Sequence, residues 1–410
     1  MNARTSAAAL PARSGRWVYA IVFAAMVVRA VLATLRRLTP DEAYYLCAAR
    51  RGALAWPIPD HPPAIGALLA TADHLFPGPI ELRVRLVSIV LQAVTALGVA
   101  RLAAELAPRR GADPLVAATV AAALATWMLL PTAGGLIATP DAPLLAALAW
   151  LLVATFRQQR SALDDFAALG LTAIALASKV SALALVAPLA LHAAATRDGR
   201  RVLTLVCGAA LGLAFALPSL RMQLAHAIGL GPAVTAPNVG PLPALGALLA
   251  SQLALWTPPV VWIALRASRR LPRAIAFACA VLVGALVLSA IVSGRAPEPN
   301  WIAPAALPLL AIAAVDLSVA TRSSRRVVLA IAVLPTVAAI ALWIAPPILP
   351  AGRDPLARAP HGDAPLPSEI PPYGVAAWRC VYASRCADID AIFVGYDVAL
   401  TPMRERAPIR

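Results

Sequence analysis

Apolar stretches of about 20 residues recur along most of the chain and are separated by short polar breaks. A helix of that length crosses the hydrocarbon core of a bilayer. The pattern therefore predicts an all-α polytopic membrane protein with about eleven transmembrane helices. We expect them near residues 17–35, 82–106, 114–131, 142–156, 165–177, 179–195, 202–220, 243–265, 274–293, 301–320 and 327–345.

The break at residues 36–81 is long and too polar to cross a membrane. It contains two short helix-like pieces, 41–50 and 62–76, which we expect to be amphipathic helices lying on the membrane surface. We therefore divide the chain into a transmembrane domain, residues 1–345, and a small C-terminal segment, residues 346–410.

Arginines gather in alternate breaks, which identifies those breaks as cytoplasmic. They lie at residues 4–16, 109–110, 157–160, 197–201, 266–273 and 322–326. The loop 36–81 and the segment 346–410 then face outward. The net charge of +15 is explained by these loops and by lipid head groups, so we expect no nucleic-acid partner.

The five cysteines show no metal-binding spacing. Cys380 and Cys386 both lie in the C-terminal segment. If that segment is extracytoplasmic, as the arginines indicate, the two are candidates for a disulfide.

Candidate chemistry begins where the first apolar stretch ends. Thr39, Pro40 and Glu42 form the pattern of a helix capping box, and the same Thr-Pro-Asp tripeptide returns at residues 139–141. Capping alone explains each occurrence. A carboxylate held at a helix N-terminus also stays ionised and fixed in position, as a catalytic base requires. Two such carboxylates on the outer face favour a functional role.

Asp60 and His61 stand in the proline-rich run PDHPP. One interpretation is a stiff turn with a solvated Asp–His pair. The alternatives are contacts with a divalent metal ion or with a phosphate, because both residue types ligate metals and a protonated histidine binds phosphate. Two candidate ligands do not decide between these interpretations.

Lys179 is the one lysine in a chain with 34 arginines, and it lies at the outer end of an apolar stretch. It is either a snorkelling lysine or a point charge for a lipid phosphate. Arg83 and Arg85 lie on the outer side, against the positive-inside trend, and are further candidates for an anionic head group. Arg295 and Asn300 add another outward-facing polar group.

Several motifs occur together in an order and spacing that resembles the GT-C membrane glycosyltransferases. The resemblance is to their bacterial branch, which is related to protein O-mannosyltransferases and to transferases that add aminoarabinose to lipid A. It covers about residues 17–320 and rests on TPDEAYYLCAARRGALAWPIPDHPPAIGAL, RVRLVS, TPDAPLL, ALASKVSAL and PNWIAPA.

This resemblance implies a polyprenyl-phosphate-linked sugar as donor and an active site in the first extracytoplasmic loop. It identifies Asp41 as the catalytic base or acceptor-orienting carboxylate, Glu42 as its neighbour and Asp141 as a second active-site carboxylate. Tyr44 of the same motif is expected to line the site. In the lipid A branch a lysine near the donor phosphate typically stands where this chain has His61. Because this chain departs from that pattern, His61 could contact either a phosphate or a metal ion.

We therefore predict an inverting transfer of a sugar to an outward-facing lipid, glycan or protein hydroxyl. Asp41 would take the acceptor proton, and Lys179, with His61 and the outer arginines Arg83 and Arg85, would hold the donor phosphate. A transporter or flippase is the alternative, and a non-catalytic lipid-binding subunit is another. Transport predicts ionisable residues at mid-membrane and paired interrupted helices, whereas the charges here gather at one outer face.

Overall fold

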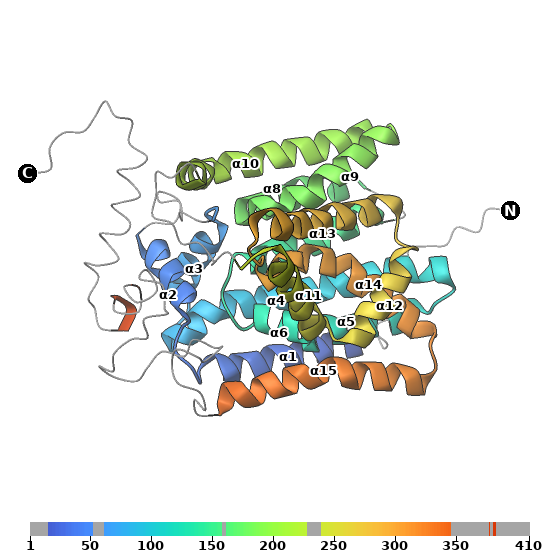
Figure 1. The fold of residues 1–410 in the computed structure, drawn as a ribbon, viewed down its shortest axis with the longest axis horizontal. Helices are drawn as coiled ribbons and strands as arrows, with labels where there is room; N and C mark the ends of the chain where they lie inside the picture. The colour runs from blue at the N-terminus through green and yellow to red at the C-terminus, as the bar shows by residue number, and fades with distance from the viewer. Residues whose placement is uncertain are drawn as a thin grey trace, which may run out of the picture.

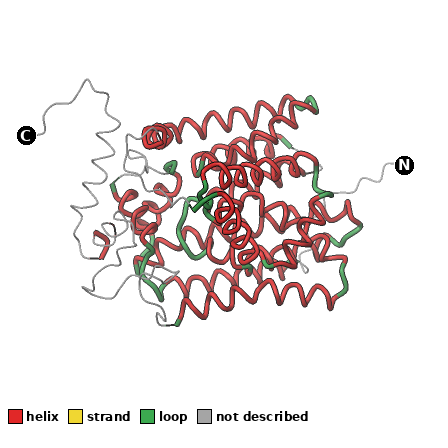
Figure 2. Tube along the Cα trace, viewed as in Figure 1, coloured by secondary structure: helices red, strands yellow, loops and turns green. Residues whose placement is uncertain are grey.

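The computed structural model describes residues 15–51, 61–157, 161–227, 239–345, 377 and 380–382 of the 410-residue chain. Within these residues the chain consists of helices and connecting loops (Figure 2). The α-helices are α1 (Arg16–Ala33), α2 (Pro40–Arg50), α3 (Ala64–Leu75), α4 (Ile80–Leu106), α5 (Pro114–Trp127), α6 (Leu129–Gly134), α7 (Asp141–Phe156), α8 (Ala162–Ser178), α9 (Leu183–Ala195), α10 (Gly199–Ala227), α11 (Pro241–Trp256), α12 (Pro258–Ser268), α13 (Arg273–Ser293), α14 (Ala303–Val319) and α15 (Arg322–Ile344). Short 3₁₀ helices are η1 (Ala107–Arg110), η2 (Val180–Ala182) and η3 (Pro299–Ile302).

The apolar stretches expected from the sequence are helical, which confirms an all-helical, multi-pass membrane protein. Six helical segments in the described part are long and apolar enough to cross a membrane, and the bent pair α11–α12 would be a seventh. They are α1, α4, α10, α13, α14 with η3, and α15. Helices α5, α7 and α9 are apolar but shorter. Helix length therefore does not confirm the expected number of eleven.

The segment expected as one span at 243–265 is two helices that meet at an angle of 99°. Thr257 joins them with a φ of 62°, and α12 then begins with Pro258 and Pro259. A proline lacks the N–H that would continue the preceding helix, so two of them end α11 at Trp256.

Close contacts between the long helices depend on glycines, as is common in membrane bundles. A Cβ on Gly98 of α4 would meet Ala149 Cβ of α7 at 2.8 Å. One on Gly208 or Gly212 of α10 would meet backbone oxygens of α8 at 2.6 Å. The outer helices instead present exposed apolar side chains such as Phe23 of α1, which suits contact with lipid tails.

Helices α2 and α3 lie together at one end of the bundle, which we call the α2/α3 end (Figure 1). The expected capping box is present, because Thr39 Oγ1 accepts the Glu42 N–H while Glu42 Oε2 accepts the Thr39 N–H. The expectation that α2 is amphipathic is wrong: residues 42–49 are all buried against other parts of the protein. The run AYYLCAA is apolar around the whole helix, so α2 packs on every side.

Candidate active site

Three side chains that are far apart in the sequence form one polar cluster at the α2/α3 end. Lys179, at the end of α8, places its Nζ 2.9 Å from Asp141 Oδ1 at the start of α7. Asn300 of η3 donates from Nδ2 to the other oxygen, Asp141 Oδ2. The Lys179 ammonium also lies over the Trp301 ring, 5.9 Å from its centroid. The two carboxylate oxygens of Asp141 are thus both hydrogen-bonded, and the only lysine of the chain is fixed in place.

Two cavities lie on either side of this ion pair. The larger has a volume of about 500 Å³, and Asp141 and Asn300 line it together with a mostly apolar wall from α4, α5, α6, α7, α11 and α14. The smaller has a volume of about 230 Å³, and its polar lining includes Lys179, His61 and Ser181. Trp301 and two leucines of α13 form its apolar side. The carboxylate of the ion pair therefore borders the large cavity, and its cation borders the small one.

His61 stands between the small cavity and α2. Its ring lies edge-on to Tyr45, with 5.9 Å between ring centroids, and its carbonyl accepts a hydrogen bond of 2.7 Å from Ser219 Oγ of α10. Burial, with the nearby Lys179 charge, lowers the pKa of His61 to about 4, although Asp141 opposes the shift. The imidazole is therefore neutral at neutral pH. The neutral imidazole can donate one N–H to a phosphate.

The metal interpretation of His61 gains no support from its surroundings. Over the residues that the structure describes, no group of three or more His, Cys, Asp or Glu side chains is placed to hold a metal ion. Its expected partner Asp60 lies outside the described residues. A divalent ion at this position stays a prediction.

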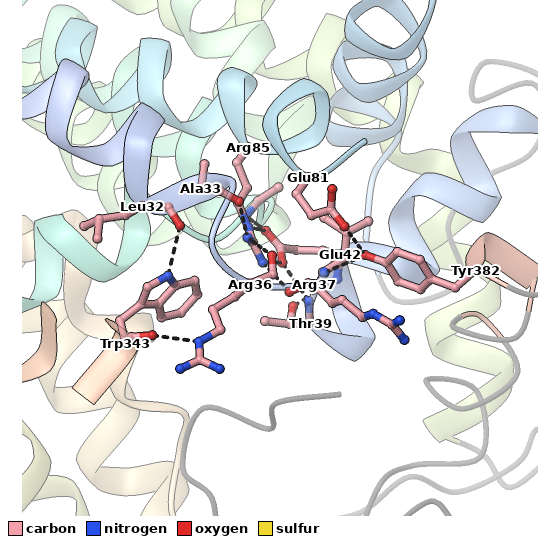
Figure 3. Close-up of polar contacts among 12 residues, drawn as sticks. Leu32, Ala33, Arg36, Arg37, Thr39, Glu42, Glu81, Arg85, Trp343 and Tyr382 are labelled. Atoms are coloured by element: carbon pink, nitrogen blue, oxygen red, sulfur yellow. Dashed lines mark hydrogen bonds and ion pairs between the residues drawn. The ribbon is translucent and has the colours of Figure 1, made fainter. Parts of the chain in front are cut away.

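Glu42 and Arg85 form a fully buried ion pair beneath the first loop (Figure 3). Arg85 donates from Nε and Nη2 to the two carboxylate oxygens of Glu42, at 3.0 and 2.8 Å. Its remaining N–H groups reach the carbonyls of Ala33, Arg36 and Arg37, each at 2.7 Å. A guanidinium has five N–H groups, so none is left for a ligand. Donor-phosphate binding by Arg85 stays a prediction, and this geometry favours a structural role instead.

Glu42 has no free oxygen for catalysis either. Besides Arg85 and the Thr39 N–H, it accepts the N–H of Ala138, in the loop before α7, at 3.0 Å. A catalytic role for Glu42 stays a prediction. The geometry favours a structural role, because this carboxylate joins the start of α2 to α4 and to the loop before α7.

Asp41 is the neighbour of Glu42 and, unlike it, is exposed. Residues four apart on a helix lie on the same face, so Asp41 shares a face of α2 with Tyr45. Tyr45 contacts the His61 ring, which lines the small cavity. The face of α2 that carries Asp41 is therefore the face that looks towards His61 and the small cavity.

The other predicted residues lie outside the cluster. Arg83 Nη1 is 2.9 Å from Asp73 Oδ1 and also reaches the Asp73 carbonyl, so it fastens α4 to α3. Arg295 is exposed on the loop before η3. Tyr44 is buried in α2, with its ring 5.7 Å from that of Tyr45.

Two further links were not foreseen from the sequence. Arg36 donates to the carbonyls of Trp343, at 2.7 Å, and of Ala345, and Trp343 Nε1 donates to the Leu32 carbonyl at 3.0 Å. The Trp343 ring also faces the Arg85 guanidinium at 5.3 Å. These contacts fasten the end of α15 to the corner between α1 and α2 (Figure 3).

Comparison with known proteins gives a match to a family model and a likeness of fold. Residues 60–222, less than half of the chain, match the family model for dolichyl-phosphate-mannose-protein mannosyltransferase. The crystal structure of ArnT from Cupriavidus metallidurans in the apo state superposes with a TM-score of 0.59 at 19% identity, over 95% of this chain and 76% of that one. The same protein bound to undecaprenyl phosphate gives a TM-score of 0.55 at 21% identity, over 94% and 77%.

No protein of curated function is similar enough in sequence to add to these matches. The structural likeness extends over nearly the whole chain and reaches helices that the family match does not cover. The chain thus has the fold of ArnT, and together with the match over residues 60–222 this confirms its resemblance to the GT-C membrane glycosyltransferases.

Proposed function

We propose that the chain is a membrane glycosyltransferase that moves a sugar from a polyprenyl-phosphate donor to an acceptor at the outer face of a bacterial inner membrane. The observation that carries this proposal is the position of Lys179. Its ammonium borders a cavity of about 230 Å³, and Asp141, which holds it, borders an apolar cavity of about 500 Å³. A lipid-linked sugar phosphate has the matching parts: an apolar chain, an anionic phosphate and a compact polar ring.

In this proposal Lys179 binds the donor phosphate. An ammonium has three N–H groups, and Asp141 receives one of them. The others are available to phosphate oxygens, and the hydrogen bond from Asn300 keeps Asp141 itself in place. Asp141 is then a positioning residue for Lys179, since one of its oxygens holds the ammonium and the other is held by Asn300. The neutral His61 adds an N–H donor within the small cavity.

The sugar would occupy the small cavity, where Trp301 and the leucines of α13 can cover the apolar face of its ring. Bond breaking separates the anomeric carbon from the phosphate oxygen and leaves a second negative charge on the lipid phosphate. Lys179 stabilises that developing charge in a partly dry site, where electrostatic interactions are strong.

Asp41 is the proposed general base. It would accept the proton of the acceptor hydroxyl as that oxygen attacks the anomeric carbon from the side opposite the phosphate, which inverts the configuration. Its exposure allows a large acceptor to approach, while Glu42 and Arg85 hold the backbone beside it. Lipid, glycan and protein hydroxyls all fit this arrangement. No step in the mechanism passes through a metal ion.

The arginines indicate which side of the membrane the site faces. The ends of the helices opposite the α2/α3 end carry Arg-rich loops, for example residues 266–273 and 322–326. By the positive-inside rule those ends are cytoplasmic, so the α2/α3 end faces the periplasm.

The test is to incubate purified protein in detergent or nanodiscs with a labelled polyprenyl-phosphate sugar and a cell-envelope acceptor fraction. We expect release of free polyprenyl phosphate together with label in the acceptor. A matched reaction without acceptor measures hydrolysis. Failure to release lipid phosphate from any of a panel of such donors would overturn the proposal.

The bent pair α11–α12 is the one observation that favours the alternative, a lipid or sugar transporter, because interrupted helices line transport sites. A transporter would move the intact donor across proteoliposomes without cleaving it. The same labelled donor separates the two functions, since only transfer produces free lipid phosphate.

A further inference from the structure

The described residues of the C-terminal segment lie against the first loop. Ala377 is fully buried, and its carbonyl is 3.8 Å from Cys47 Sγ of α2. Cys380, Val381 and Tyr382 pack against the apolar cluster built around α2 and α3. A segment far away in the sequence is thereby part of the packing around the helix that begins with Asp41.

Tyr382 makes the most specific of these contacts (Figure 3). Its hydroxyl accepts the backbone N–H of Leu38 at 2.8 Å and donates to Glu81 Oε1 of α4 at 2.9 Å. The Arg37 guanidinium lies over its ring, 5.0 Å from the centroid. Leu38 is buried, so its N–H needs a partner within the protein, and the Tyr382 hydroxyl is one.

The contact with Leu38 matters because Leu38 belongs to the turn that presents Asp41. Leu38 precedes Asp41 by three residues, and Glu42, held by Arg85, follows Asp41 directly. The turn that presents Asp41 is therefore held on both sides, by Tyr382 before it and by Arg85 after it. A proton acceptor must keep its geometry to within a fraction of an ångström to work efficiently.

Cys380 adds a covalent constraint two residues before Tyr382, because it is disulfide-bonded. Cys47, Cys207 and Cys279 form no disulfide. A disulfide restricts the segment that carries it and so favours the docked position of Tyr382. Reduction by dithiothreitol would convert the bond into two thiols, while the reagent becomes its cyclic disulfide.

We propose that Tyr382 is a positioning residue for Asp41, and that the disulfide at Cys380 keeps it docked, so that glycosyl transfer depends on an oxidised C-terminal segment. The inference rests on the proposed function, because Asp41 is the base only if the protein is a glycosyltransferase. It assigns the C-terminal segment a role in catalysis rather than in substrate binding.

The first test is Tyr382→Phe in the full-length protein, which keeps the ring and removes both hydroxyl contacts. We expect kcat to fall about tenfold, which corresponds to ~1.4 kcal/mol, with the donor KM unchanged within a factor of about two. Tyr19→Phe, on the exposed face of α1, is the matched control and should keep both values. Unchanged kcat in Tyr382→Phe, or a loss carried entirely by the donor KM, would overturn the proposal.

The second test concerns the disulfide. We expect Cys380→Ser to lower kcat severalfold, dithiothreitol to lower wild-type kcat to the same level, and the reagent to leave Cys380→Ser unchanged. Full activity of Cys380→Ser, or wild-type activity that dithiothreitol does not change, would refute the role of the disulfide.

Hydrogen exchange of residues 38–50 distinguishes failure of this inference from failure of the proposed function. Faster exchange there in Tyr382→Phe supports the docking contact even if no donor is turned over. If wild-type protein releases no lipid phosphate, the proposed function falls and with it the catalytic role of Tyr382. If the wild type is active but exchange in Tyr382→Phe is unchanged, the inference is rejected and the proposed function stands.

Discussion

Arg85→Lys tests whether the buried ion pair under the first loop is structural or binds the donor. Arg85 gives five N–H groups to five acceptors: two oxygens of Glu42 and three backbone carbonyls. Lysine offers three N–H groups, so at least two buried acceptors lose their partner. At ~1–3 kcal/mol for each, the variant should be destabilised by roughly 2–6 kcal/mol.

The assay is thermal unfolding of purified protein in detergent, followed by loss of the helical circular dichroism signal. We expect a clearly lower midpoint for Arg85→Lys, with a donor KM near the wild-type value in the protein that remains folded. Arg83→Lys, two residues earlier on α4, is the matched control. Its ion pair with Asp73 is partly exposed, so it should cost at most about 1 kcal/mol. An unfolding midpoint of Arg85→Lys equal to that of the wild type, combined with a donor KM raised tenfold or more, would refute the reasoning. It would support a phosphate-binding role for Arg85.

Further predictions concern the polar cluster and its pH dependence. Lys179→Met should raise the donor KM by about tenfold or more, because a buried phosphate loses a charged partner, and Asp141→Asn should act in the same direction more weakly. An unchanged donor KM in Lys179→Met would contradict the placement of the phosphate. Because the pKa of His61 is lowered to about 4, its imidazole stays neutral as pH rises from 5 to 8, so kcat/KM should show no step near the ordinary histidine pKa. A step near pH 6.5 that disappears in His61→Gln would refute this.

The helices and the cap of α2 were predictable because their causes are local. The second Thr-Pro-Asp tripeptide forms no side-chain cap, because the N-cap of α7 is Pro140. The capping box at Thr39 and Glu42 needs only residues three apart, and apolar stretches fold as helices wherever the bilayer is the solvent. The bend at Thr257 also had a local signal, since Pro258 and Pro259 stand inside the stretch expected to be one span. The all-apolar run of α2 likewise marked a buried rather than a surface helix.

The partners within the site could not be predicted in the same way. Lys179 and Asp141 were each singled out, but their pairing depends on how α7 and α8 pack. An arginine on the outer side has the same sequence signature whether it meets a phosphate or a set of carbonyls. Tertiary packing alone therefore determines that Arg85 binds backbone carbonyls. Tyr382 had no signal, because its contact joins residues 344 positions apart.

The central claim is that Asp41, rather than its buried neighbour Glu42, is the base of a glycosyl transfer. The most direct measurement is the single-turnover rate of lipid-phosphate release by Asp41→Asn, with donor affinity measured in the same preparation. General-base catalysis contributes about 10²–10⁴-fold, so release should slow by at least two orders of magnitude while the donor Kd stays within about twofold. Release within tenfold of wild type, or a loss explained by weaker donor binding, would contradict the account.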